Sequence, residues 1–169
     1  PPLKYATEEV EALHGIMGGK AVIGRSARKD SLIQEAGQYR IVHLSTHGKA
    51  NDKVGDYSFL AFSEVKDSVD NEWLYVRDIY NLSLNADMVV LSACETGIGE
   101  LKRGEGIISL ARAFAYAGAK SIVTTLWSVD DAKTKDLMVF FYRNLKQGMT
   151  KDEALRQASP AEVIEAALK

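Results

Sequence analysis

Apolar and polar positions along this chain alternate in blocks that predict strands separated by helices. The runs at 39–45 and 87–92 have the length of buried strands, and Met88-Val89-Val90-Leu91 contains no polar residue. An uninterrupted run of this kind is typical of a strand buried on both faces of a parallel sheet. Strands that alternate with helices indicate an α/β fold with a mostly parallel sheet.

Apolar residues three or four positions apart mark the helices. We expect helices at 7–17, 26–36, 105–116, 131–146, 150–157 and 159–168, with one or two helical turns at 76–82. Further strands are expected at 21–23 and 120–126, and a hairpin from 58–62 and 72–76. Thr7 is a plausible helix start. The apolar residues that mark the helix at 105–116 are Ile107, Ile108, Leu110, Ala111, Phe114 and Ala115. In the helix at 131–146, the residues expected to face inward are Leu137, Phe140, Phe141 and Leu145.

Length, charge and cysteine content narrow the class of protein. A chain of 169 residues suits one domain over 1–169, and 46% hydrophobic with 26% charged residues is usual for a soluble globular protein. A net charge of −2 without blocks of like charge argues against nucleic acid or an anionic membrane as a direct partner. No stretch of ~20 apolar residues predicts a membrane span. The single cysteine suits a reducing compartment, so we expect a cytoplasmic location.

The two apolar runs each lead to one chemically reactive side chain. The first is followed by His47-Gly48 and the second by Cys94, the only cysteine of the chain. The carboxyl ends of parallel strands form the edge where such sheets bind ligands. A thiol is a useful nucleophile only as the thiolate, so it needs a nearby base, for which His47 is the natural candidate. The alternative is that Cys94 is a small buried apolar residue and His47 a hydrogen-bonded loop residue.

Gly48 adds a possible oxyanion donor to this pair. Acyl transfer places negative charge on a carbonyl oxygen, and backbone N–H groups stabilise that charge best where no side chain blocks the approach. The N–H groups of Gly48 and Cys94 are the candidate donors. An ordinary turn glycine is the alternative interpretation.

Other catalytic patterns do not fit the spacing. The interval Gly99–Gly104 matches a Walker loop, but Glu105-Gly106 stands where Lys and Ser/Thr are required. His43 and His47 are four positions apart without the Glu of His-Glu-x-x-His. We therefore expect neither a metal site nor a cofactor.

A third candidate segment is Trp127–Asp131, which follows the predicted strand at 120–126. An aromatic ring with the carboxylates of Asp130 and Asp131 would suit a substrate pocket that attracts a basic side chain. The alternative is that one of the two aspartates only caps the next helix.

Several blocks in order resemble a CHAT domain, a caspase-like peptidase module of the caspase, separase and gingipain clan that is often fused to tetratricopeptide repeats. The resemblance runs from about Leu3 to Ala158. Its blocks are His43-Leu44-Ser45-Thr46-His47-Gly48, Leu91-Ser92-Ala93-Cys94-Glu95-Thr96-Gly97, Gly104-Glu105-Gly106, Ala113-Phe114-Ala115-Tyr116-Ala117-Gly118-Ala119 and Leu126-Trp127-Ser128-Val129-Asp130-Asp131. An Ala-Cys motif with a histidine ~50 residues upstream is itself typical of caspases.

The resemblance implies a caspase–haemoglobinase-like three-layer α/β sandwich, with a mostly parallel central sheet flanked by helices. It implies that Cys94 is the nucleophile, that His47 is the general acid and base, and that Gly48 and Cys94 form the oxyanion hole. The residue two before the cysteine lines the P1 pocket in related caspases, which is Ser92 here, and a later segment contributes, here 127–131.

The resemblance also concerns what lies around the domain. Such domains usually end in a last strand with a His-Pro…Trp…Phe motif, whereas this chain continues with Ser159-Pro160-Ala161-Glu162. We expect the domain to be excised from a longer chain, with a tetratricopeptide-repeat region or a regulatory partner beside it.

The resulting prediction is a cysteine endopeptidase that cleaves a protein or peptide substrate through a Cys94–His47 dyad and a thioester. Two alternatives stay open. One is a non-catalytic or partner-gated interaction module on the same fold, and the other is a cysteine hydrolase that acts on a non-peptide acyl bond.

Overall fold

A computed structural model describes residues 3, 5–49, 51, 54–64, 72–92, 105–125 and 131–158, apart from the side chains of 105–107 and 131. Two units divide the chain. The first combines Pro1–Ile23 with Val129–Lys169, and the second is Gly24–Ser128. Each unit is considered by itself, and the single domain over 1–169 stays a prediction.

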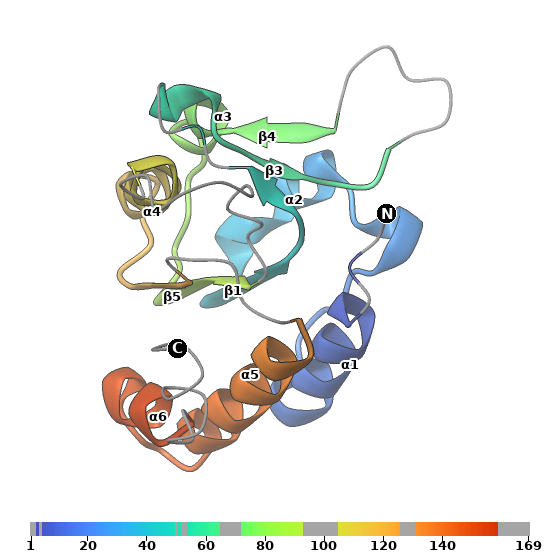
Figure 1. The fold of residues 1–169 in the computed structure, drawn as a ribbon, viewed down its shortest axis with the longest axis vertical. Coiled ribbons are helices and arrows are strands. Elements are labelled where there is room, and N and C mark those ends of the chain that lie inside the picture. The colour runs from blue at the N-terminus through green and yellow to red at the C-terminus, as the bar shows by residue number, and fades with distance from the viewer. Residues whose placement is uncertain are drawn as a thin grey trace, which may run out of the picture. The chain divides into compact units, whose positions relative to one another are not determined.

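The second unit is built on a parallel sheet of three described strands. Its strands are β1 (Ile41–Ser45), β5 (Met88–Ser92) and β6 (Ile122–Thr124), in the order β1-β5-β6. β5 is the central strand and all five of its residues are buried. Figure 1 shows β1 and β5 side by side. The predicted α/β fold with a parallel sheet and flanking helices is therefore confirmed.

A smaller antiparallel sheet follows β1 directly. It contains β2 (Gly48–Lys49), β3 (Phe59–Ala61) and β4 (Trp73–Tyr75), in the order β2-β3-β4. The expected hairpin from 58–62 and 72–76 corresponds to the antiparallel pair β3 and β4. Since β2 begins three residues after β1 ends, the segment around His47 connects the two sheets.

The helices agree with most of the predicted ranges. In the first unit they are α1 (Ala6–Met17), α5 (Asp131–Lys146) and α6 (Lys151–Ala158). In the second unit they are η1 (Gly24–Ser26), α2 (Lys29–Glu35), η2 (Ala36–Gln38), η3 (Gly55–Tyr57), α3 (Val76–Ile79) and α4 (Glu105–Tyr116). No helix among the described residues is both long and apolar enough to cross a membrane. The helix expected at 159–168 lies outside the described residues.

The core of the second unit lies on one face of the parallel sheet. Val42 and Leu44 of β1 and Val89 and Leu91 of β5 point to this face, because alternate residues of a strand share a side. They pack in one cluster with buried residues of the antiparallel sheet, α3 and α4, namely Leu60, Leu74, Val76, Ile79, Leu110 and Phe114. The cluster therefore attaches the antiparallel sheet and both helices to the parallel strands.

The first unit is helical in its described part. α5 packs against α1 and α6, with Phe141 and Tyr142 of α5 and Leu13 of α1 buried. Glu9 is also buried, and desolvation together with its charge raises the pKa of Tyr142. Buried acids normally need polar partners, so Glu9 and Tyr142 are the polar groups of this otherwise apolar helix contact.

Several detailed predictions are wrong. Residues 21–23 form no strand, and α1 begins at Ala6 without a side-chain cap from Thr7. Phe140, expected to face inward, is 49% exposed. Helical spacing identifies an apolar stripe, but the structure covers only the part of that stripe that meets a neighbouring element.

Charged residues join the amino ends of the three parallel strands. Asp87 immediately precedes β5 and pairs with Arg40, which precedes β1, and with Lys120 near β6, at 2.9 Å between Nζ and Oδ1. The hydrogen bond from Lys120 and the interaction with Arg40 lower the pKa of Asp87. These ion pairs link the starts of the three strands at the edge opposite His47.

We expect Asp87→Asn to make stability less dependent on pH. Because the folded-state pKa lies below the ordinary value of 3.8, the carboxylate stabilises the fold above that pH and loses its effect as the pH falls further. In urea unfolding, the variant should be less stable than the wild type at neutral pH, and the difference should shrink as the pH falls below 3.8 and the carboxylate becomes protonated. Asp136→Asn is the control, because Asp136 is exposed on α5. A stability difference between Asp87→Asn and the wild type that persists at low pH would contradict the proposed role of the Asp87 charge.

Gly118 offers a second test of the fold, at the turn between α4 and β6. Its φ is +115°, and a Cβ there would lie 2.2 Å from the backbone oxygen of Leu84. Gly148 also has a positive φ, +92°, but nothing within 4 Å of the added Cβ. We expect Gly148→Ala to cost about 1 kcal/mol in unfolding free energy and Gly118→Ala at least about 2 kcal/mol more. Equal losses would show that the close approach is relieved by local movement.

Candidate functional site

The two reactive side chains belong to segments that follow adjacent strands. β1 and β5 pair in parallel from Ile41 with Met88 to Ser45 with Ser92. His47 follows Ser45 by two positions, and Cys94 follows Ser92 by the same two positions. The predicted neighbouring strands are therefore confirmed. Cys94 itself lies outside the described residues.

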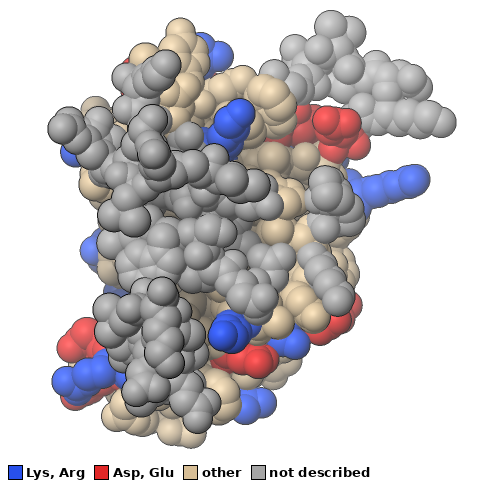
Figure 2. All heavy atoms as spheres, viewed as in Figure 1, with Lys and Arg blue, Asp and Glu red and all other residues tan. Residues whose placement is uncertain are grey.

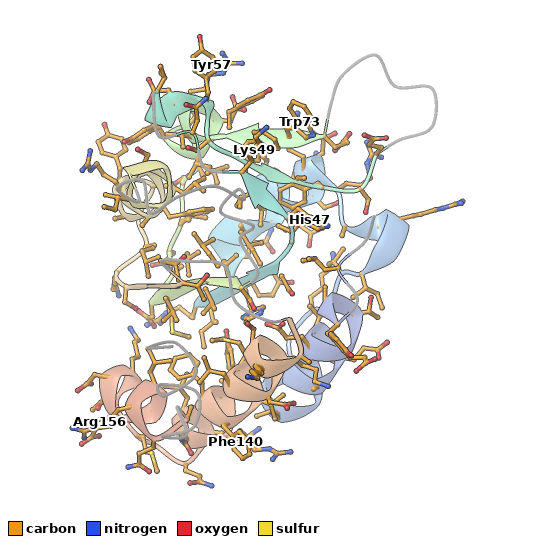
Figure 3. The ribbon with its side chains drawn as sticks, in the orientation of Figure 1. His47, Lys49, Tyr57, Trp73, Phe140 and Arg156 are labelled. Carbon is orange, nitrogen blue, oxygen red and sulfur yellow. The ribbon has the colours of Figure 1, made fainter. Side chains whose placement is uncertain are left out.

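The backbone at His47 is held by the first strand of the hairpin. Its carbonyl oxygen accepts a hydrogen bond of 2.8 Å from the N–H of Ala61, and the hydroxyl of Thr46 donates to the carbonyl of Ala61. The His47 residue is half-buried, and Figure 3 shows it close to the β2–β3–β4 sheet. These contacts fix the position of the histidine without using its imidazole ring.

Gly48 lies in β2 opposite Leu60 and is buried. Antiparallel pairs alternate between hydrogen-bonded and non-hydrogen-bonded positions. Since Ala61 donates to His47, the next hydrogen-bonded position is Lys49 with Phe59, and Gly48 falls between them. The N–H of Gly48 therefore points away from β3, as an oxyanion donor would require.

Ser92 ends the central strand with a hydroxyl in an unusual environment. The residue is 2% exposed, and its Oγ has no hydrogen-bond partner among the described residues. Buried hydroxyl groups are normally satisfied, so an orphan next to a candidate site is consistent with a group that meets a ligand. The predicted pocket role of Ser92 is compatible with this environment but is not tested by it.

Sequence reasoning missed Thr125, which has the same feature on the next strand. The register of β5 with β6 pairs Leu91 with Thr124, so its continuation brings Thr125 opposite Ser92. The Oγ1 of Thr125 is also buried without a partner among the described residues. The signal was present in the sequence, since Ser45, Ser92 and Thr125 are hydroxyl residues at the carboxyl ends of three strands.

The chain after Gly48 packs against α4, the helix that follows Cys94 in the sequence. Within this stretch the N–H of Asn51 donates to the Oγ of Ser58 at 2.9 Å, and its Oδ1 accepts from Val54 at 3.0 Å. η3 then packs against α4, and a Cβ on Gly55 would lie 2.2 Å from the Oγ of Ser109. The segments that follow the two candidate catalytic residues thus share a packing contact.

Most of the predicted pocket lies beyond what the structure describes. Trp127 and Asp130 are outside the described residues, as is the side chain of Asp131. The backbone of Asp131 is the first residue of α5, so Asp130 occupies the preceding position, where helix caps occur. Both interpretations of the two aspartates, pocket and cap, remain predictions.

Charge and metal-binding groups give no competing site in the described part of the chain. No group of three or more His, Cys, Asp or Glu residues is arranged there to hold a metal ion. On the face drawn in Figure 2, acidic and basic side chains of the described residues are interspersed. On this face the described residues form no continuous basic surface of the kind that nucleic acid requires.

Comparison with known proteins gives one family and two curated relatives. The model of the CHAT domain family matches residues 1–163. Tetratricopeptide repeat protein 28 of Mus musculus is 24% identical over 188 aligned residues, and that of Homo sapiens is 26% identical over the same length. Each match covers 93% of this chain but only 8% of the relative. The chain therefore corresponds to a small part of these much longer proteins.

We expect Ser92→Ala to leave stability unchanged or to raise the unfolding free energy by up to about 1 kcal/mol, because the lost hydroxyl has no hydrogen-bond partner among the described residues. Ser58→Ala is the matched control, since Ser58 is fully buried and its Oγ accepts the hydrogen bond from Asn51. That control should lose about 1–2 kcal/mol in urea unfolding. Comparable losses in both variants would mean that the Ser92 hydroxyl has a structural partner.

Proposed function

Because this chain belongs to the CHAT domain family, we propose that it is a cysteine endopeptidase with Cys94 as nucleophile and His47 as general acid and base. The observation that carries this proposal is the in-register pairing of Ser45 with Ser92. Adjacent strands lie ~4.8 Å apart, and each further residue extends a chain by at most ~3.5 Å. His47 and Cys94 each follow a residue of this pair by two positions, which favours a short distance between them.

The proposed reaction divides peptide cleavage into acylation and deacylation. The Cys94 thiolate adds to the scissile carbonyl carbon, and the resulting oxyanion accepts hydrogen bonds from the N–H groups of Gly48 and Cys94. Collapse of this intermediate breaks the C–N bond, while His47 gives a proton to the leaving amine. A water molecule, deprotonated by His47, then hydrolyses the thioester and regenerates the thiol.

The specificity pocket is part of the same proposal. Ser92 lines the P1 pocket, and its buried orphan hydroxyl suits contact with substrate. Trp127 and the carboxylate of Asp130 or Asp131 complete the pocket and favour Arg or Lys at P1, because an unpaired carboxylate attracts a basic side chain. Ser92 carries no charge that would select an acidic P1 residue.

A second candidate function is an interaction module that acts without catalysis. Both curated relatives are named for tetratricopeptide repeats, which form extended binding surfaces in general. In that case this part of the chain would respond to a partner that the repeats recruit. Reactivity of the Cys94 thiol separates the two functions, because only the peptidase needs a thiol activated by His47.

We expect Cys94→Ala and His47→Ala to lower kcat/KM for peptide cleavage at least ~10³-fold while the thermal unfolding midpoint stays near that of the wild type. The assay is digestion of a random peptide library by the intact protein, read by mass spectrometry. His14→Ala is the matched control, because His14 is exposed on α1. It should cleave like the wild type.

A thiol-reactive probe gives an independent measurement on the same variants. Labelling of Cys94 should be fast in the wild type, slow in His47→Ala and unchanged in His14→Ala. Cleavage that survives Cys94→Ala would refute the peptidase. Slow labelling that is indifferent to His47, together with no cleavage, would support the interaction module.

A further inference from the structure

The antiparallel sheet has an outer face that continues from the candidate catalytic histidine. Gly48, Leu60 and Leu74 are paired across the three strands and all are buried. Successive residues of a strand point to opposite faces, so their neighbours point outward. One outward row contains Lys49, Phe59 and Tyr75, and the next contains Ala61 and Trp73. His47 belongs to this second row, because Ala61 donates its N–H to the His47 carbonyl.

Three aromatic rings form a continuous surface on this side, which we call the aromatic face and define as Phe59, Trp73 and Tyr75. The rings of Phe59 and Trp73 are stacked, with centroids 4.4 Å apart and an interplanar angle of 10°. Tyr75 contacts both rings edge-on, at 5.6 Å from Phe59 and 6.2 Å from Trp73. Trp73 is nevertheless 38% exposed. Rigid aromatic side chains that remain accessible are the usual anchors of a binding surface.

Two basic residues, Arg77 and Lys49, lie at the rim of the aromatic face. The Arg77 guanidinium lies over the Tyr75 ring, 5.0 Å from its centroid, and Lys49 is exposed in the same row. The carboxylate of Asp78 accepts the Tyr75 N–H at 3.1 Å through Oδ2 as part of a helix cap, and its Oδ1 lies 3.9 Å from Nε of Arg77. An acidic side chain on a bound partner would therefore meet complementary charge at Lys49 and Arg77.

We propose that the aromatic face binds the substrate polypeptide on the leaving-group side of the scissile bond, and that it takes an aromatic or large aliphatic residue next to an acidic one. This inference rests on the proposed peptidase function. There His47 protonates the leaving amine, so the residues that follow the scissile bond depart past His47. One face of the sheet extends from His47 to Trp73, and the substrate residues after the scissile bond can bind along it.

The dimensions fix which substrate residues are involved. Trp73 lies two strands away from His47, which corresponds to ~10 Å at ~4.8 Å per strand. An extended peptide covers ~3.3–3.6 Å per residue. The aromatic face would therefore contact the substrate at about the third residue after the scissile bond. Figure 3 shows Lys49 and Trp73 along this sheet, with Tyr57 at η3 beside it.

A polypeptide fits this surface better than a nucleic acid. Aromatic rings beside basic groups also bind single strands, but that mode needs a positively charged groove along the backbone. The rim supplies Lys49 and Arg77, the chain carries a net charge of −2, and the charges in Figure 2 are mixed. A short segment with one acidic side chain matches two flanking cations, whereas a run of phosphates does not.

The test measures binding without cleavage, using the Cys94→Ala form of the intact protein. The probe is a fluorescein-labelled peptide of glycine and serine with Phe-Glu-Trp at its centre, titrated by fluorescence anisotropy. A second peptide carries Lys in place of Glu, and a third carries Ala in place of both aromatics. We expect the first peptide to bind at least about tenfold more tightly than the third.

Two pairs of variants locate the binding surface. Trp73→Ala should weaken the first peptide about tenfold, whereas Phe140→Ala, which removes an exposed ring that also contacts an arginine, should not. Lys49→Glu should weaken binding of the first peptide and strengthen binding of the second, because the charge at position 49 is reversed. Arg156→Glu on α6 should change neither affinity. The Lys49 exchange keeps the test valid if Trp73→Ala is unstable.

The remaining outcomes overturn the proposal. They are equal affinity for all three peptides, tighter Trp73-dependent binding of an oligothymidine of equal length, and Trp73-dependent self-association in sedimentation. Failure of the peptidase is recognised separately, because thiol-probe labelling of Cys94 depends on His47 and should be unaffected by Trp73→Ala. In an active enzyme, Trp73→Ala should raise KM only for substrates with at least three residues beyond the scissile bond.

Discussion

The pairing of β1 with β5 is the constraint on which the rest of the structure depends. β1 alternates between half-buried and buried residues, and its buried pair, Val42 and Leu44, belongs to the core. A shift of one residue would turn that pair away from the core. The register is therefore fixed by burial, and it carries the segment after Ser45 to the same level as the segment after Ser92. Core packing thus sets the geometry of the candidate site.

The segment from Thr46 to Gly48 connects the two sheets and is positioned by both. It continues β1 of the parallel sheet and enters β2 of the antiparallel sheet. Ala61 contacts it twice, as donor to His47 and as acceptor for the Thr46 hydroxyl. A segment held in this way has little conformational entropy left to lose, which is what the proposed role of His47 in catalysis would require.

Sequence patterns predicted the elements that carry strong local signals. The apolar run of β5 and the position of His47 after β1 could be predicted, because a buried strand is a run of consecutive apolar residues and its end is visible where that run stops. The apolar residues at 21–23 failed as a strand, since a strand also needs a neighbouring strand to pair with, which local apolar character does not show. The prediction that Phe140 faces inward failed, because the spacing of apolar residues in a helix does not show how much of the apolar stripe a neighbour covers.

The aromatic face could not be predicted for a related reason, since its residues come together only through the register of three strands. That same register explains the glycine at position 48. A side chain there would point to the face on which Leu60 and Leu74 are buried, while the backbone N–H lies in the plane of the sheet and points away from β3. Glycine therefore fills the inward position without disturbing the core, and the alternation turns His47 and Lys49 outward together. Core packing, the candidate oxyanion donor and the proposed substrate surface are thus consequences of one strand register.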